Sequence, residues 1–472
     1  MRVSHNFPAI SATFDDPNLV SCAGLAPTMA LAQRAGLTDL VAHTLTLKAK
    51  GGVNAHLKVP ALVAGMVAGA DSIDDMDLLR HGGMGRLFTG VRAPSTLGTF
   101  LRSFTFGHVR QLDAVASRFV IALAKNAPIL AGADQGCYVD IDDTIKATYG
   151  YAKAGAGHGY NGVKGLNALL AIVSTPISAP VVVATRLRRG PANSARGAAR
   201  IVADALVTAK ACGGTGLVTV RADSAYYGHD VVAAARRGGA RFSVTVRMNR
   251  TVVKAISEIE ESAWVPIHYP NAIWDEDEQR LVSDAEVAEV PYFTAFTSRR
   301  KADHISARLI VRRVKRLNPK TVPAGQGELF SAYRHHGVFT DSPLVMLEAE
   351  KTHREHAIVE QVIADFKGGA LAHLPSIILS RRVGRAADLH RCVVDGVLDV
   401  ARKGLGQHGP MSFAARRSGV SRLVVLPRTR AVRVVPSAWA RASCSCRFAC
   451  SRRWMRSVAT SSLRSREATE AR

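Results

Sequence analysis

YVDIDDT, residues 138–144, is typical of a β-strand that carries carboxylates. Successive side chains of a strand point to opposite faces, so Val139 and Ile141 would face a hydrophobic core. Asp140 and Asp142 would then share the other face. Carboxylates gathered at one spot repel each other, and divalent cations with oxygen ligands relieve that repulsion. This strand therefore predicts one part of an acidic site.

Two further acids complete the pattern. In TVRADSAYYG, residues 219–228, Asp223 follows a strand-like run, and in HREHAIVEQVIADFK, residues 353–367, Glu360 lies in a run with helical periodicity. Divalent cations held by such acids activate a water or hydroxyl nucleophile. Together with Asp142, these residues predict a two-metal site for phosphoryl transfer on a nucleic-acid backbone.

Each acid also has an ordinary explanation. An aspartate at a strand end before Ser or Thr often forms a turn or caps a helix, which would account for Asp142 or Asp223 alone. Glu360 alone would more often belong to a solvated helix face or pair with Lys367. The prediction therefore depends on all three acids occurring together.

The composition favours a globular protein with an acidic partner. Of the 472 residues, 47% are hydrophobic, which excludes a wholly disordered chain, and the formal charge is +24. Lys and Arg replace the counterions condensed on a phosphate backbone, so nucleic acid is the first expected partner and a membrane surface the second. No apolar run reaches the ~20 residues of a bilayer span and no secretory signal is recognisable, so we expect a cytoplasmic protein.

Periodicity divides the chain into five segments. Helical runs predict an N-terminal helical DNA-binding domain over 1–130, and strand-like runs with an intervening helix predict an α/β domain over 131–248. Short strand-like pieces predict a mostly β insertion over 249–345. Helical periodicity returns over 346–376, where the third acid lies. The tail, 377–472, holds 20 Lys and Arg against 5 Asp and Glu.

The helix of the third acid has an apolar and a polar face, because steps of three, four and seven residues return to nearly the same angle. The apolar face holds Ile358, Val359, Val362 and Phe366, and the polar face holds His353, His356, Glu360 and Lys367.

One N-terminal motif has two interpretations. APSTLGTFLRSFTFGHV, residues 93–109, predicts a helix capped by Ser95 or Thr96 after Pro94. It is either part of a helix-turn-helix that reads DNA or an ordinary core-packing helix with a solvated basic face.

Two other motifs have no expected catalytic chemistry. GAGHGYNGVKG, residues 155–165, looks like a phosphate-binding loop, but Lys164 lacks the following Ser or Thr and a strand follows, so we expect a flexible hairpin. Cys444, Cys446 and Cys450 have no matching second pair, so we do not expect a zinc site.

The acids and their neighbours resemble the DDE transposases of bacterial insertion sequences, most closely insertion-sequence family 1380 within the family-4-like group. The resemblance covers about residues 10–375, and its most specific pieces are VDIDDT, GAGHGYNGVKGLNALLAIVSTP, VRADSAYYGHD and HREHAIVEQVIADFKGGALAHLPS. It implies an RNase H-like (retroviral-integrase-like) α/β core in which acids from the first strand, the fourth strand and a later helix surround two Mg²⁺ ions, with Mn²⁺ as a substitute.

Carried over by position, the resemblance implies that Asp142, Asp223 and Glu360 are the catalytic and metal-binding residues, with Asp140 as the alternative first acid. The implied reaction is hydrolysis at each element end, followed by attack of the freed 3′ hydroxyl on target DNA. The implied partners are double-stranded DNA, as terminal inverted repeats and target, and a second subunit in a homodimer. The implied location is the bacterial nucleoid.

The resemblance also implies DNA contacts. Lys367 keeps the family's place on the third-acid helix, but His353 and His356 replace its tyrosine and arginine. A neutral histidine cannot form the bidentate fork of arginine on phosphate, so we expect Arg354 or Lys351 to compensate. Two further expectations concern residues elsewhere: Tyr226 as a DNA contact, and a basic strand that either binds phosphates or forms a solvated edge, Arg308, Arg312, Arg313, Lys315 and Arg316.

The tail leaves the state of the protein open. The resemblance stops near residue 376, and an arginine- and serine-rich sequence follows, as out-of-frame translation of GC-rich DNA would give. The alternative is a disordered DNA-binding tail. Besides an active transposase, the sequence therefore allows a frameshifted copy that binds DNA without cleavage, or a related metal-dependent nuclease.

Overall fold

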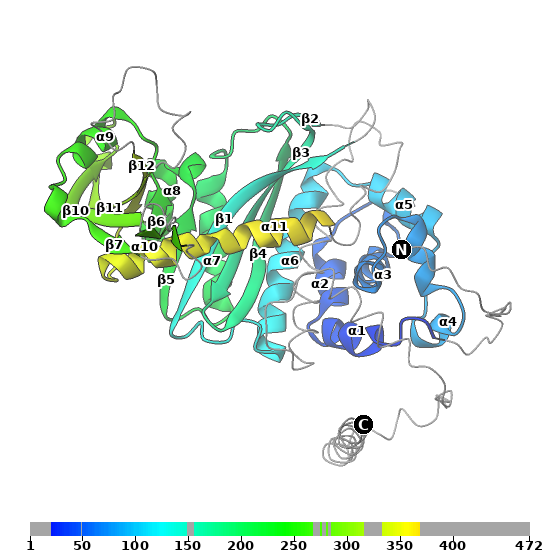
Figure 1. Cartoon of the computed structure of the whole chain (residues 1–472). Coiled ribbons are helices and arrows are strands. Elements are labelled where there is room, and N and C mark those ends of the chain that lie inside the picture. Colours follow the sequence, from blue (N-terminus) through cyan, green and yellow to red (C-terminus); the bar gives the residue numbers. More distant parts are fainter. Residues whose placement is uncertain are drawn as a thin grey trace, which may run out of the picture. The chain divides into compact units, whose positions relative to one another are not determined.

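A large mixed β-sheet organises the chain in this computed structural model (Figure 1). The structure describes residues 20–48, 50–148, 155–267, 274–275, 280–281, 285–315 and 333–368. The strands of the first half are β1 (Gly136–Ala147), β2 (Gly157–His158), β3 (Lys164–Thr175), β4 (Ser178–Arg189), β5 (Leu217–Ala222) and β6 (Arg241–Thr245). The later strands are β7 (Val265–Ile267), β8 (Trp274–Asp275), β9 (Arg280–Leu281), β10 (Ala285–Ala295), β11 (Ile305–Lys315) and β12 (Tyr333–Thr340).

The strand order explains how distant parts of the sequence meet. β1 pairs antiparallel with β3 on one side and parallel with β5 on the other, while β4 lies antiparallel beside β3 and β6 parallel beside β5. This arrangement confirms the mixed α/β class and is consistent with an RNase H-like core. The later strands extend the same sheet in the order β12, β11, β10 and β7, while β8 and β9 form a separate pair.

The N-terminal part is helical in the residues that the structure describes. Its helices are α1 (Leu25–Arg34), α2 (Leu37–Thr44), α3 (Ala55–Ala68), α4 (Met84–Leu87), α5 (Pro94–Arg102) and α6 (Phe106–Asn126), with short 3₁₀ turns at Lys50–Gly52 and Asp74–Leu79. The predicted cap of α5 is wrong: Ala93 is the N-cap and Pro94 the first helical residue, a position where the missing N–H of proline costs nothing. The buried side chains of these helices share one hydrophobic cluster with the sheet. A separate DNA-binding domain in this region stays a prediction.

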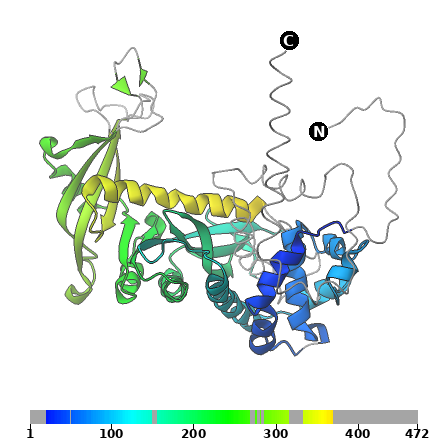
Figure 2. The ribbon, with the colours of Figure 1, turned by 90° about the horizontal axis from the view of Figure 1, so that it is seen from below.

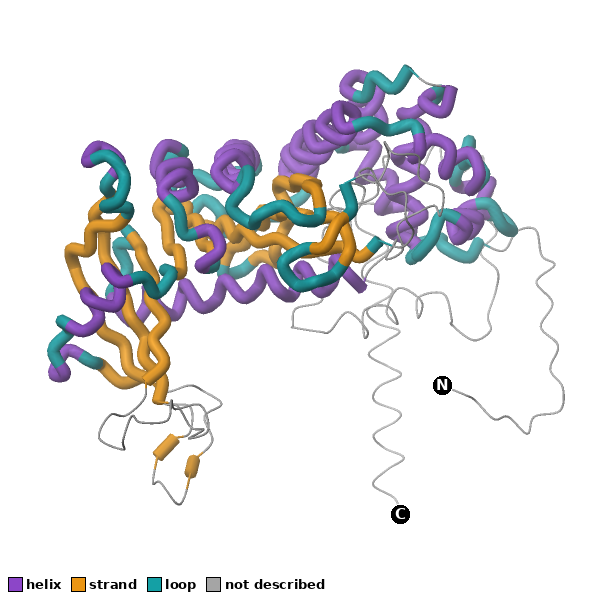
Figure 3. Tube along the Cα trace, turned by 90° about the horizontal axis from the view of Figure 1, so that it is seen from above, coloured by secondary structure: helices purple, strands orange, loops and turns teal. Residues whose placement is uncertain are grey.

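Helices cover both faces of the sheet. One face carries α6, α7 (Ala198–Ala211) and α8 (His229–Arg237), and the other carries α10 (Met346–Arg354) and α11 (Ile358–Gly368), as Figures 2 and 3 show. The short α9 (Arg250–Ser257) follows β6. The two covered faces bury separate hydrophobic clusters. The sheet is therefore the middle layer of three.

The helix of the third acid differs from its prediction in one respect. A 3₁₀ turn, Glu355–Ala357, separates α10 from α11 and shifts the phase of the buried face. Val359, Ile363 and Phe366 pack against β3, whereas Ile358, expected on the apolar face, is 36% exposed. This packing turns Glu360 away from the core.

Several sequence expectations fall outside the described residues. The arginine-rich tail, the three cysteines within it and Arg316 belong to this group. Within the described part of the chain, no helix is long and apolar enough to cross a membrane.

Candidate active site

Asp142 is the centre of the acidic site. It lies on β1, and it accepts a hydrogen bond at Oδ1 from the N–H of Asp143 over 2.7 Å. Burial, together with the charges of Asp223, Asp143 and Glu360, raises the pKa of the Asp142 carboxyl to about 7. The charged groups that act most strongly on this half-buried carboxylate are other carboxylates, which repel its negative charge instead of neutralising it.

Asp223 reaches Asp142 through the parallel pairing of β1 and β5. Ile141 on β1 pairs with Ala222 on β5. The residues that follow them, Asp142 and Asp223, therefore lie side by side at the same end of the sheet. Asp223 also caps the 3₁₀ turn Ser224–Tyr226, because its Oδ1 accepts the N–H of Ala225 over 2.9 Å. Asp223 therefore caps a turn, as its ordinary explanation predicts, and also lies beside Asp142. Burial is the main cause of its raised pKa.

Glu360 approaches from the opposite layer. It is exposed in the first turn of α11, and its charge raises the pKa of Asp142. Asp223 and Glu360 thus both lie within electrostatic reach of Asp142. Within the described residues, none of the three forms an ion pair with a basic side chain.

The three carboxylates are suitable ligands for a hard divalent cation, although they do not lie close enough together to coordinate one. Carboxylate oxygens are the ligands that Mg²⁺ prefers, and the mutual repulsion recorded in the pKa of Asp142 is what a cation would relieve. Among the described residues, no three histidine, cysteine or carboxylate side chains are close enough together to hold a metal ion. The chemistry of the residues fits a metal, and the acids would have to approach one another to bind it.

Asp140, the alternative first acid, is occupied. Its side chain is fully buried in a bidentate ion pair with Arg221, with Nε–Oδ1 at 2.7 Å and Nη2–Oδ2 at 2.8 Å. Arg221 also donates to the carbonyl oxygen of Thr352 over 2.6 Å and stacks on Tyr138. The pair therefore ties β1 and β5 to α10, which is a structural role.

Asp143 explains why the expected DNA contact of Tyr226 is wrong. The Tyr226 side chain is fully buried, and its hydroxyl donates to Asp143 Oδ1 over 2.7 Å, so it offers no surface to DNA. Asp143 also pairs with Arg188 at 2.9 Å and accepts a hydrogen bond from Asn167. Arg188 further donates to three carbonyl oxygens of the loop after β4. This network supports β1 from behind the site.

His353 is likewise not a DNA contact. Its ring is buried and bonded on both nitrogens, to Ser243 Oγ and Thr245 Oγ1, each at 2.9 Å. Burial, aided by nearby positive charges, lowers its pKa to about 3, so the ring is neutral. His356 stacks on His353 with ring centroids 5.3 Å apart and lies close enough to Asp223 to lower the pKa of that carboxyl. Of the two predicted histidines, only His356 adjoins the acids.

The remaining basic predictions divide. Arg354 forms an ion pair with Glu350 at 2.8 Å, while the side chain of Lys367 is exposed at the end of α11. On β11, Arg308, Arg312 and Arg313 pair with glutamates of neighbouring elements, and Arg313 is also stacked between Trp264 and Tyr333. The solvated-edge interpretation is wrong, because β11 is an inner strand of the sheet. Phosphate binding by these three arginines stays a prediction, although their charges are paired within the protein.

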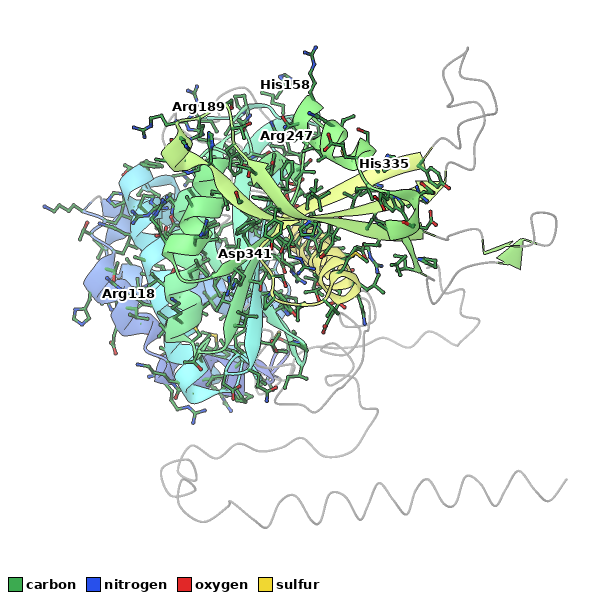
Figure 4. All side chains as sticks on the ribbon, turned by 90° about the vertical axis from the view of Figure 1, so that its left-hand side faces the viewer. Arg118, His158, Arg189, Arg247, His335 and Asp341 are labelled. Atoms are coloured by element: carbon green, nitrogen blue, oxygen red, sulfur yellow. The ribbon has the colours of Figure 1, made fainter. Side chains whose placement is uncertain are left out.

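Basic side chains that the sequence analysis did not select lie at the acidic end of the sheet. Arg189 is the exposed last residue of β4, and His158 is exposed on β2. Arg247 donates to the carbonyl oxygens of Ser224 and Ala225, the two residues that follow Asp223. Figure 4 shows Arg189, His158 and Arg247 in the upper part of the view. These residues share an end of the sheet with the acids only because of how the strands are ordered, and the spacing of residues in the sequence does not reveal that order.

The buried arginines were also missed. Arg188 and Arg221 lie in apolar strands, and a charged residue in such a run is a usable signal of a buried ion pair. The partner of each is a β1 aspartate that depends on strand order, which the sequence does not give.

Comparison with known proteins assigns the chain to a family. No curated protein matches the chain. A family model described as transposase DDE domain group 1 matches residues 4–320, which include Asp142 and Asp223 and end before Glu360. Because the match covers more than half of the sequence, the chain belongs to the DDE transposase family, domain group 1.

Proposed function

We propose that the chain is the transposase of a bacterial insertion sequence related to family 1380. It would hydrolyse the phosphodiester at each element end and join the freed 3′ hydroxyl to target DNA. The observation that carries this proposal is the surroundings of Asp142: a half-buried carboxylate next to two further acids, none of them ion-paired within the described residues. Such an arrangement costs stability and is explained by a function that brings cations to it.

Asp142, Asp223 and Glu360 would hold two Mg²⁺ ions, for which Mn²⁺ can substitute. When bound, these ions activate the attacking water and stabilise the leaving oxygen. The chain's own residues have separate tasks. Asp142 and Asp223 supply oxygens from adjacent strands, and Glu360 supplies them from the facing helix. We propose that His356, which adjoins Asp223, and Lys367, farther along α11, contact the DNA end.

The proposed partner is double-stranded DNA, as terminal inverted repeats and as target, bound by a homodimer. The exposed Arg189 would contact phosphates beside the acids, because charged side chains at the rim of an acidic site offset its repulsion of the DNA backbone. Arg247 would hold the turn that carries Asp223, through its hydrogen bonds to Ser224 and Ala225.

The test compares the purified protein with Glu360→Gln on labelled DNA from the element ends, with magnesium present. We expect cleavage to fall on the order of 10³-fold, because the glutamine removes one charged oxygen donor where charge develops. Glu355→Gln is the matched control, since Glu355 is also exposed and lies five residues earlier, in the 3₁₀ turn before α11. It should cleave as the unaltered protein does.

Three outcomes would point elsewhere. Equal cleavage by the Glu360→Gln variant would refute the role of Glu360. Cleavage without preference for element ends would indicate a metal-dependent nuclease. Binding of end DNA without strand release, even with manganese, would indicate a decayed copy.

A further inference from the structure

The hairpin formed by β2 and the start of β3 is not used by the proposed chemistry. Gly157 pairs with Gly165 and His158 with Lys164, so the glycine-rich motif is a β-hairpin, as expected. The turn is closed by hydrogen bonds from the N–H of Gly159 to the carbonyl oxygen of Val163 and from the N–H of Gly162 to that of Gly159, each 3.0 Å long. Its tip carries Tyr160.

The glycines of this hairpin serve close packing rather than flexibility. Gly162 has φ +75°, a left-handed conformation that a side chain would strain. A Cβ at Gly159 would lie 2.5 Å from the side chain of Ile145, and one at Gly157 would lie 2.9 Å from Pro191. Ile145 is buried on β1, three residues after Asp142. The hairpin is therefore fixed against the strand that carries the first acid.

Tyr160 is an exposed aromatic residue beside the acids. Its side chain is 71% exposed, although tyrosine normally buries most of its ring. Partial burial raises the pKa of its hydroxyl, and the charges of Asp143, Asp142 and Asp223 raise it as well. The side chain therefore lies within electrostatic reach of the site and stays protonated at neutral pH. Tyr226, the tyrosine that the sequence analysis selected, is buried below the same acids.

We propose that Tyr160 stacks on an unpaired nucleobase next to the phosphate that the acids cut, and so positions the DNA strand. This inference rests on the proposed function. Aromatic faces stack on any base, because every base has a π-face, so the contact needs no particular sequence. Tyr160 is a positioning residue and performs no chemical step.

The experiment uses the full chain and a short single-stranded oligonucleotide with 5-iodouracil, which forms a photochemical cross-link to an aromatic ring stacked on it. Calcium replaces magnesium to prevent cleavage. Binding is measured in parallel by fluorescence anisotropy. We expect the cross-link to map to Tyr160 by mass spectrometry. Tyr160→Ala should abolish it and weaken binding about tenfold, while Tyr160→Phe should bind within about twofold of the unaltered protein. The control is Tyr292→Ala, because Tyr292 is 91% exposed on β10, a strand that carries none of the three acids.

The variants separate stacking from its alternatives. Equal weakening by Tyr160→Ala and Tyr160→Phe would assign the contact to the hydroxyl and overturn stacking. Bound DNA whose cross-link lies elsewhere would also overturn it and leave the proposed function intact. A chain that binds neither this oligonucleotide nor duplex DNA from the element ends would contradict the proposed function, and the inference would fall with it. A chain that binds only the duplex would overturn stacking alone. Unchanged thermal unfolding of the variants shows that they are folded.

Discussion

Three aspartates within four residues of β1 differ in whether a basic side chain neutralises them. Asp140 and Asp143 are each paired with a buried arginine, Arg221 and Arg188. Asp142 lies between them in sequence and has only carboxylates as charged neighbours that raise its pKa. The first two are satisfied by the protein itself, and the third is not. Charge pairing, rather than the presence of an acid, therefore distinguishes the structural carboxylates from the candidate metal ligand.

The arginines show the same division. Arg308, Arg312 and Arg313 sit on an inner strand and pair with glutamates. Arg189, at the exposed end of β4, forms no ion pair within the described residues. A basic side chain that is already neutralised gains little from a phosphate, so the formal charge of a segment overstates what it offers to DNA.

Removal of Arg221 should give the largest effect on stability. Arg221→Met leaves Asp140 buried without its partner, and breaking such a pair costs about 3–5 kcal/mol. Urea unfolding at pH 7 measures the loss. The double variant Asp140→Leu/Arg221→Met should recover most of it. Arg200→Met is the control, because the Arg200 side chain is 73% exposed, and its pair should contribute less than about 1 kcal/mol.

A small loss of unfolding free energy for Arg221→Met would contradict the distinction between the paired Asp140 and the unpaired Asp142. It would mean that Asp140 tolerates burial without its partner, as Asp142 does. Asp140 would then return as an alternative first acid.

The sequence predicted the acids better than their surroundings. Alternation along β1 placed Asp140 and Asp142 on one face and Val139 and Ile141 in the core, because the two-residue period is local. Helical and strand-like periodicity likewise agrees with the helices and strands that the structure describes, while the bounds of the five segments stay a prediction. These properties depend on neighbours in sequence, so one sequence suffices to find them.

The pairing of charges was not predictable in the same way. Arg221 meets Asp140 only because β5 lies beside β1, and Tyr226 is buried only because Asp143 accepts its hydroxyl. The phase of α11 depended on a 3₁₀ turn that periodicity does not reveal. Each of these facts comes from strand order or helix phase, which is why the DNA contacts expected at Tyr226 and His353 were wrong.

The pH dependence of stability should separate Asp142 from another buried acid, Asp113 on α6. Burial raises the pKa of both carboxyls from 3.8 to about 7. A raised pKa means that the folded state holds the proton more tightly, so the free energy of unfolding falls as pH rises from about 4 to about 7. Magnesium favours the ionised form of Asp142, so at pH 7 and above it should restore the free energy of unfolding lost through Asp142. The loss through Asp113 should remain.

Thermal unfolding of Asp142→Asn and Asp113→Asn, each with and without magnesium, measures the two parts. We expect Asp142→Asn to lose the response to magnesium and Asp113→Asn to keep it. Stabilisation of Asp142→Asn by magnesium equal to that of the unaltered protein would place the cation elsewhere.

The smallest expected effect concerns the arginines. Each phosphate contact contributes about 0.9 to the slope of log affinity against log salt concentration for duplex DNA. Arg189→Gln should therefore reduce the slope by about one contact. Arg312→Gln should leave it unchanged, because Arg312 is paired with Glu350 at 3.3 Å. Fluorescence anisotropy over a range of salt concentrations measures both. Equal reductions would show that Arg312 exchanges its glutamate for phosphate, in which case pairing within the protein would not decide which basic residues reach DNA.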